Sequence, residues 1–180
     1  MNKRLLMKTM ITLLSFCLMV SCTSMISSMD SKIMIGHDLK ASRVKNRYFS
    51  KQPSITDYQK LKDQGFETVI NLRDPSEHEE AFEKTNVEKV GMKYINIPFP
   101  KDLKLTKDYV AKVHKRVKDH EDNGKILIHC STGNRASMWL GAEFHEYEGY
   151  TEEESLKMSK QMGLNKDKAV DALRAYFAKD

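Results

Sequence analysis

The feature that most constrains this chain is a short apolar run that ends in a cysteine. Residues 125–129 read Lys-Ile-Leu-Ile-His, and Cys130 follows directly. Branched apolar residues without a polar interruption predict a buried strand. A tight turn containing Gly133 leads into a helix, which we predict from about residue 135 to residue 148. The turn therefore presents Cys130 at the carboxyl edge of a sheet, where open α/β sheets bind their ligands.

The rest of the chain alternates between strand-like and helix-like patterns. Strands are expected at 44–49, 66–72 and 94–99, and helices at 55–64, 76–89 and 106–122, with two more beginning near Thr151 and Asn165. In the helix at 76–89, Ala81, Phe82 and Val87 are expected to face inward. Strands that alternate with helices predict an α/β sandwich whose central sheet is largely parallel and flanked by helices.

The first 22 residues have the composition of a targeting segment. A positive region formed by Lys3, Arg4 and Lys8 is followed by an apolar run over residues 10–20. That run has the length of a signal peptide and is too short to cross a membrane comfortably. It ends in Leu-Met-Val-Ser-Cys at residues 18–22, which resembles the processing box of bacterial lipoproteins.

This resemblance implies that Cys22 becomes the lipidated first residue of an exported protein. Acyl chains on that residue would hold the protein at the membrane, and Thr23 beside it favours the outer membrane, on the periplasmic side. An uncleaved N-terminal anchor and a plain secretory signal remain alternatives. We therefore expect a signal peptide at 1–22, a tether at 23–42 and one folded domain at 43–180.

The charge of the chain does not indicate nucleic-acid binding. The full sequence carries 30 basic and 25 acidic residues, and the signal peptide removes three of the basic ones, which leaves a net charge of +2. The remaining charges are well mixed along the sequence, so no basic patch is expected. Cys130 is the single cysteine after Cys22, so no disulfide is expected within the domain.

The residues from Cys130 to Arg135 are suited to hold an anion beside a nucleophile. Backbone N–H groups at the start of a helix can point inward around an anion, and Arg135 can offer a bidentate fork to phosphate. The same positive surroundings favour the thiolate form of Cys130, which is the nucleophilic form. The alternative is a cysteine buried for packing alone. The expected phosphate-binding residues are Ser131, Thr132, Gly133, Asn134 and Arg135.

The His-Cys…Arg loop resembles that of the protein tyrosine and dual-specificity phosphatase superfamily. Three further strings narrow the resemblance: Ser-Lys-Gln-Pro-Ser at 50–54, Val-Ile-Asn-Leu-Arg at 69–73 and Tyr-Ile-Asn-Ile-Pro at 94–98. Over about residues 43–150 the chain resembles the bacterial phosphatase-like family related to the phosphatase domain of beta-lactamase-hydrolase-like proteins. The resemblance implies a phosphorylated protein or small molecule as substrate, hydrolysed through a phosphocysteine at Cys130.

The loop departs from the usual tyrosine phosphatase pattern in two ways. Four residues separate Cys130 from Arg135, where most tyrosine phosphatases have five, so the loop offers one amide fewer to a phosphate. The residue after the arginine is Ala136, where many of these enzymes have Ser or Thr, although Ser137 follows it. These departures bear on catalytic efficiency and substrate type more than on fold.

The same resemblance implies a general acid on a loop after the preceding strand. Asp102 fits this role, because prolines 98 and 100 end that strand just before it. The alternative is that Asp102 is a solvated loop residue. Arg73 and Asp74 end the neighbouring strand and border the cleft in one interpretation, whereas Arg73 is a structural ion-pair partner in the other.

Two other functions remain open. Rhodanese-like sulfurtransferases share the loop length Cys-x-x-Gly-x-Arg and carry a persulfide on the cysteine, and a non-catalytic phosphate-binding lipoprotein is the third hypothesis. The six histidines show no metal-ligand spacing, and the phosphatase mechanism requires neither a metal nor an organic cofactor. His129 is expected to pack behind the loop and to orient it.

Overall fold

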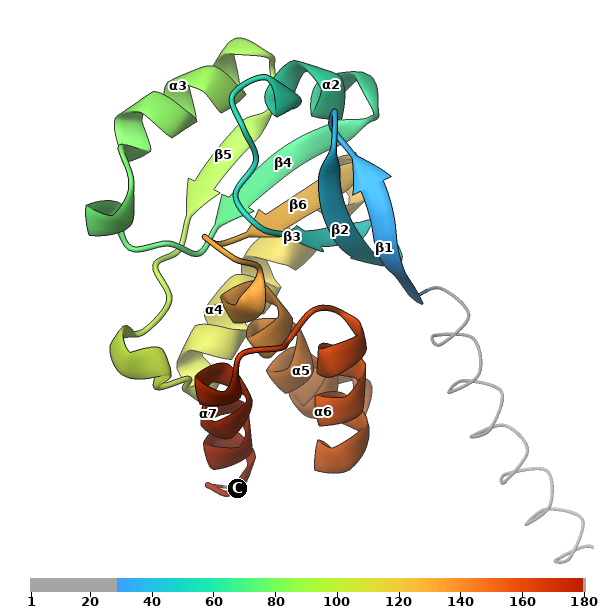
Figure 1. The fold of residues 1–180 in the computed structure, drawn as a ribbon, viewed down its shortest axis with the longest axis vertical. Helices are drawn as coiled ribbons and strands as arrows, with labels where there is room; N and C mark the ends of the chain where they lie inside the picture. The colour runs from blue at the N-terminus through green and yellow to red at the C-terminus, as the bar shows by residue number, and fades with distance from the viewer. Residues whose placement is uncertain (1–28, 180) are drawn as a thin grey trace, which may run out of the picture.

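The computed structural model describes residues 29–179, which form one mixed sheet covered by helices on both faces (Figure 1). The strand order is β1-β2-β3-β6-β4-β5. The first three strands pair antiparallel, whereas β3, β6, β4 and β5 run parallel. The strands are β1 (Met29–Ile35), β2 (Leu39–Val44), β3 (Arg47–Ser50), β4 (Phe66–Asn71), β5 (Lys93–Asn96) and β6 (Lys125–His129).

Helices α2 and α3 cover one face of the sheet and α4 to α7 cover the other (Figure 1). This arrangement confirms the predicted α/β sandwich with a largely parallel sheet. The helices are α2 (Asp57–Asp63), α3 (Glu80–Lys89), α4 (Lys107–Lys118), α5 (Asn134–Glu148), α6 (Glu152–Gln161) and α7 (Asp167–Phe177), with short 3-10 turns η1 (Pro75–Glu77), η2 (Lys101–Leu103) and η3 (Glu121–Asn123). No helix within residues 29–179 is both long and apolar enough to cross a membrane.

Strand β6 is buried on both faces, which explains why its sequence is a continuous apolar run. Ile126 and Ile128 pack into the core beneath α4 to α7, whereas Leu127 packs into the core beneath α2 and α3. Successive side chains of a strand point to opposite faces, so a strand between two helical layers needs apolar residues at every position. The prediction for residues 125–129 is confirmed at both ends.

Residues 29–42, which the sequence assigned to a tether, belong to the folded domain, and the rest of that expected tether lies outside the described residues. Residues 29–35 form β1 and residues 39–44 form β2, so the folded domain already includes the part from Met29 onward. The single strand expected at 44–49 is interrupted by a turn at Lys45, whose φ of +56° lies in the left-handed region. The expected signal peptide and Cys22 lie outside the described residues.

The face of helix α3 that packs against the core differs from the face that the sequence predicted. Phe82 was expected to face inward, but the residue is 51 % exposed, whereas Glu83 beside it is 6 % exposed. Val87 is fully buried, as predicted. A glutamate therefore takes an interior position on this helix, and its partners lie under the loop that follows β6.

Candidate functional site

The loop after β6 brings the sulfur of Cys130 to the bottom of a tight turn. The residue is 1 % exposed, and its Sγ accepts a hydrogen bond from the backbone N–H of Gly133 at 3.2 Å. Gly133 has a φ of +90°, and an added Cβ would lie 3.4 Å from the backbone of Ser50. The turn can therefore close over the sulfur because its third residue lacks a side chain.

Around that sulfur the loop offers backbone donors without acceptors. Within the described part of the chain, no acceptor is found for the N–H groups of Ser131, Thr132, Asn134 or Arg135. Helix α5 begins directly after Gly133, which supplies no side-chain cap. Unpaired N–H groups and the positive end of a helix dipole favour an anion at this position.

Arg135 lies at the rim of the loop, where Glu77 from η1 holds its side chain. Both Nη atoms donate to the Glu77 carboxylate, Nη2 to Oε2 at 2.7 Å, and Nη2 also donates to Ser131 Oγ at 2.6 Å. A guanidinium has five N–H donors, and these contacts occupy three of them. The two that remain, on Nε and Nη1, point to opposite sides of the guanidinium, so a bidentate phosphate contact through Nε and Nη2 requires the phosphate to displace Ser131 Oγ.

The pair between Glu77 and Arg135 is stable over the range of pH in which an enzyme works. The hydrogen bonds from Arg135 lower the pKa of Glu77 to about 2. A carboxylate whose pKa is lowered in the folded state contributes its stabilisation at pH values above its ordinary pKa, and loses it as pH falls through the lowered value. Burial alone would lower the pKa of Arg135, but its contacts with Glu77 and with the Cys130 sulfur raise it, so the guanidinium stays charged.

Replacement of Glu77 by glutamine is expected to lower kcat/KM for an aryl phosphate by about tenfold to a hundredfold, because one charge-assisted anchor of Arg135 is lost. Steady-state phosphate release measures the effect. The matched control is Glu153→Gln, on the exposed first turn of α6. A Glu77→Gln variant with the kinetics of the control would show that Glu77 does not orient Arg135.

Asp102 borders the same cavity as Arg135. This cavity, with a volume of about 580 Å3, also receives Phe99 from the end of β5 and Lys168 from α7. Asp102 has a φ of +55°, which is uncommon for a residue with a side chain. Among residues 29–179 its carboxylate has no hydrogen-bond or ion-pair partner.

The two other carboxylates of this cavity are already engaged. Asp74 accepts hydrogen bonds from the backbone N–H and hydroxyl of Ser76, which lower its pKa. Glu77 is bound to Arg135, as described above. A general acid must be able to give its proton to the leaving group, and among residues 29–179 Asp102 is the one carboxylate of the three without a hydrogen-bond or ion-pair partner.

The structure decides between the two interpretations of Arg73. Its Nη2 donates to Glu83 Oε2 at 2.7 Å, and the side chain is 11 % exposed. Asn71, at the end of β4, donates to the same oxygen and accepts from the Arg73 backbone N–H. Arg73 is therefore a buried structural partner beneath the site, and Asp74 borders the cavity.

Glu83 is the centre of a buried polar cluster that supports the cysteine loop from below. Its Oε1 accepts hydrogen bonds from Tyr58 and Gln52, and lies 3.2 Å from Nε2 of His129. Burial would raise the pKa of Glu83, but the His129 ring and these hydrogen bonds keep its pKa well below the usual range. One ionised carboxylate thus joins the segments after β3 and β4 to the end of β6, which fixes the residue before Cys130.

Asn134 braces the loop from the opposite side. Its Oδ1 accepts hydrogen bonds from the backbone N–H groups of Asn165 and Lys166, both at 2.9 Å, and its Nδ2 donates to Asn165 Oδ1. The helix expected to begin near Asn165 is α7, whose N-cap is Lys166 and makes no side-chain cap. The side chain of Asn134 is committed to this brace, so only its backbone N–H faces the anion position.

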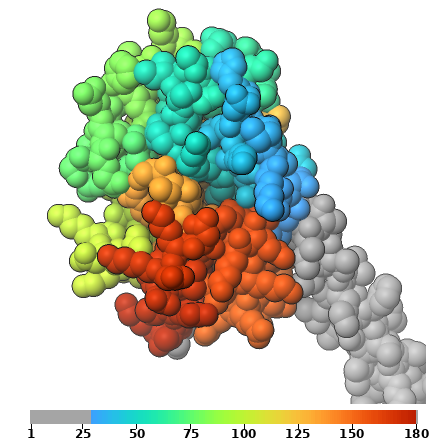
Figure 2. Space-filling view, viewed as in Figure 1, coloured from blue at the N-terminus to red at the C-terminus, as the bar shows by residue number. Residues whose placement is uncertain are grey.

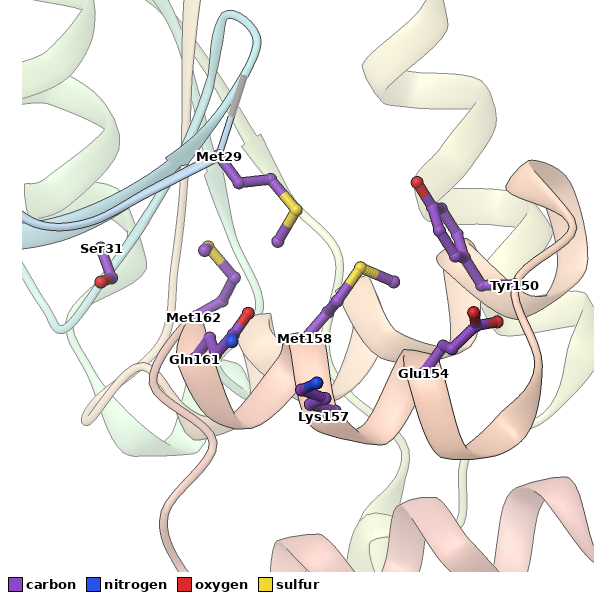
Figure 3. Close-up of a pocket in the computed structure, with 8 residues that line it drawn as sticks. All are labelled: Met29, Ser31, Tyr150, Glu154, Lys157, Met158, Gln161 and Met162. Atoms are coloured by element: carbon purple, nitrogen blue, oxygen red, sulfur yellow. The ribbon is translucent and has the colours of Figure 1, made fainter. Parts of the chain in front are cut away.

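A separate cavity of about 460 Å3 lies between β1 and α6, and Met29, Met158 and Met162 point into it (Figure 3). None of the residues from Cys130 to Arg135 lines it. It therefore belongs to a different part of the surface from the cysteine loop. Figure 2 shows the light-orange segment near residue 130 reaching the surface between green, teal and red segments.

No group of three or more His, Cys, Asp and Glu side chains within residues 29–179 is arranged to hold a metal ion. Cys130 and Arg135 lie at the two ends of the loop formed by residues 130–135, and Asp102 lines the same cavity as Arg135. Sequence reasoning missed Glu77 and Glu83. Ala81 and Phe82, both expected to face inward, are exposed, and the sequence signal for Glu83 was its position four residues before the buried Val87, on the same helical face.

No protein-family model matches the chain, and no curated protein matches it in sequence. The solved structures that are similar in fold include the following three. A cysteine-to-serine variant of P. aeruginosa TpbA in complex with phosphotyrosine has a TM-score of 0.63 and 16 % identity, over 76 % of this chain and 82 % of that one. A protein of Shewanella putrefaciens assigned as a phosphatase (DUF442) has a TM-score of 0.60 and 21 % identity, over 81 % and 91 %.

The active form of Tk-PTP has a TM-score of 0.61 and 17 % identity, and the match covers 74 % of this chain and 92 % of that one. At such identities the likeness establishes the fold. The sheet order, the helical layers and the cysteine loop described above agree with it. The chain therefore has the fold of the tyrosine and dual-specificity phosphatases.

Proposed function

We propose that this protein is a phosphomonoester hydrolase that works through a phosphocysteine at Cys130. The observation that carries the proposal is the loop itself, in which the Cys130 sulfur accepts a hydrogen bond from Gly133, Arg135 lies at the rim, and four backbone N–H groups have no acceptor among residues 29–179. The phosphorylated substrates of proteins with this fold, such as the phosphotyrosine bound to TpbA, support it. A phosphorylated protein or small molecule is the proposed substrate.

The proposed reaction has two displacements at phosphorus. The thiolate of Cys130 attacks, the phosphorus–sulfur bond forms, and the bond to the leaving oxygen breaks as Asp102 gives that oxygen a proton. Arg135 and the loop amides neutralise the equatorial oxygens while charge shifts among them. Water, losing a proton to Asp102, then attacks the phosphocysteine, so that phosphate leaves and the thiolate is restored.

The full-length chain, purified in mild detergent, tests this proposal on two substrates. Phosphatase chemistry predicts release of phosphate from para-nitrophenyl phosphate. The rhodanese alternative predicts thiocyanate from thiosulfate and cyanide, and the binding-module alternative predicts neither product but retained affinity for phosphate. Thiocyanate without phosphate release would overturn the proposal.

Replacement of Asp102 by asparagine is expected to lower kcat by about a hundredfold or more, because a general acid commonly contributes that much. The loss should be larger for phenyl phosphate than for para-nitrophenyl phosphate, whose better leaving group needs less protonation. The fall in kcat on the alkaline side of the pH profile should also disappear. Asp122→Asn, on the exposed turn η3, is the matched control. Equal losses on both substrates with an unchanged profile would exclude Asp102 as the acid.

We also propose that the protein is exported and held on the periplasmic side of a membrane by lipid on Cys22. The apolar run before Ser21 and the cysteine after it support the proposal. Cys22→Ala is expected to move most of the protein out of the membrane fraction and to abolish labelling with radioactive palmitate. Cys17→Ala, within the apolar run, should change neither result. Continued membrane association of the Cys22→Ala variant would count against lipidation.

A further inference from the structure

A groove of about 380 Å3 opens beside the cysteine loop, on the side away from Asp102. It lies between β2, the end of β3 and the segment after α6. The loop residues Thr132 and Gly133 form part of its wall, so it borders the loop in which we propose that phosphate binds. The side chains that give it polarity are Lys32, Lys40, Lys51, Ser42, Thr132 and Asn165.

The charged side chains that line this groove are all positive. Its three lysines are exposed, and none of them has an ion-pair partner among residues 29–179. No Asp or Glu lines the groove, whereas the cavity beside Arg135 has Asp74, Glu77 and Asp102, and the cavity beside Met158 has Glu154. Three uncompensated ammonium groups in one concave site favour a multiply charged anion.

The backbone of β1 is bent at the residue that supplies one of these lysines. The pairing register between β1 and β2 shifts between Asp30 and Ile33, so one extra residue stands on β1. Lys32 has a φ of +65°, a conformation that costs energy for a residue with a side chain. Bulges of this kind redirect a side chain and are common next to functional sites. Here Lys32 reaches the same groove as Lys40 from the neighbouring strand.

We propose that this groove binds a second phosphate group of the substrate while the first phosphate lies in the cysteine loop. The inference rests on the proposed phosphatase function and narrows its substrate class to molecules that carry two phosphates. Lysine ammonium groups bind phosphate as point charges, and Thr132 belongs both to the cysteine loop and to the wall of the groove. A small bisphosphate and a doubly phosphorylated peptide share this chemistry.

Two matched substrate pairs test the proposal with the full-length chain. One pair is fructose 6-phosphate and fructose 1,6-bisphosphate, and the other is a peptide with one or with two phosphotyrosines. In at least one pair, kcat/KM for the doubly phosphorylated member should be about tenfold higher. The pair that shows the preference identifies the source of the second phosphate. The preference should shrink as salt is added, because the lysines are exposed.

The triple variant Lys32→Gln/Lys40→Gln/Lys51→Gln should lose this preference and keep its activity on para-nitrophenyl phosphate. The control variant Lys60→Gln/Lys89→Gln/Lys157→Gln removes the same charge from exposed lysines elsewhere and should keep the preference. Activity on para-nitrophenyl phosphate without a preference in either pair would overturn the groove proposal alone.

A readout that does not need turnover separates the two proposals. Calorimetry on the Cys130→Ser variant should show the doubly phosphorylated member of the preferred pair binding about tenfold more tightly, and this difference should vanish when the three groove lysines are also replaced. If the wild-type chain releases no phosphate but the binding difference is found, the phosphatase proposal fails and the anion groove stands. Equal binding of both members in both pairs would reject the groove.

Discussion

The Cys130→Ser variant is expected to lose phosphatase activity by a factor of about 10⁴ or more, since removal of a nucleophile leaves only the contribution of binding and electrostatics. A serine hydroxyl has nearly the shape of the thiol, and it can still accept the hydrogen bond from the Gly133 N–H that now ends on sulfur. The variant should therefore fold and bind phosphate. Phosphate release and calorimetry with inorganic phosphate measure the two properties separately.

An acid-quench experiment makes the expectation about Cys130 sharper. After reaction with a radiolabelled phosphomonoester, the acid-quenched wild-type chain should carry a covalently bound phosphoryl group. Treatment that cleaves thiophosphate esters should remove this label. The serine variant should carry no label after the same interval. Thr132→Ser, two residues further along the same loop, keeps the sulfur and is expected to trap the intermediate. Turnover that survives in Cys130→Ser would remove this sulfur from the mechanism.

The Arg135→Lys variant is expected to lose about 10²–10³-fold in kcat/KM although it keeps its positive charge. An ammonium cannot make two parallel hydrogen bonds to phosphate while also holding both oxygens of Glu77. Most of the loss should appear in kcat, because the fork matters most where charge spreads over the equatorial oxygens. Arg174→Lys, whose side chain is exposed on α7, is the control. A lysine variant with near-normal kcat would show that charge alone is sufficient.

The elements that the sequence predicted best are those whose surroundings can be inferred from local pattern. The strand at 125–129 has the apolar residues Ile126, Leu127 and Ile128 in succession, and the helix expected to begin near Thr151 starts with a capping box of Thr151 and Glu154. The first two strands could not be found in this way. Residues 29–35 alternate poorly between buried and exposed positions, because β1 is an edge strand whose order depends on pairing with β2.

The supporting groups of the site depend on contacts between distant parts of the chain. Glu77 and Arg135 are separated by 58 positions in the sequence, and no local periodicity connects them. In α3 the sequence predicted the apolar Phe82 as an inner residue, whereas the structure buries Glu83 beside it. Glu83 can occupy the inner position because its buried partner Arg73 stabilises a carboxylate that an apolar interior would destabilise.

The hydrogen bonds of Asn134 connect the cysteine loop to the segment between the last two helices, so these helices support the site although their composition does not suggest it. The Asn134 side chain holds the backbone at Asn165, where the chain passes from α6 to α7. If the C-terminal end frayed, the cysteine loop would therefore lose this support before the sheet itself began to unfold. Any change that detaches α7 should be detected first as a loss of turnover, and only later as a loss of folded protein.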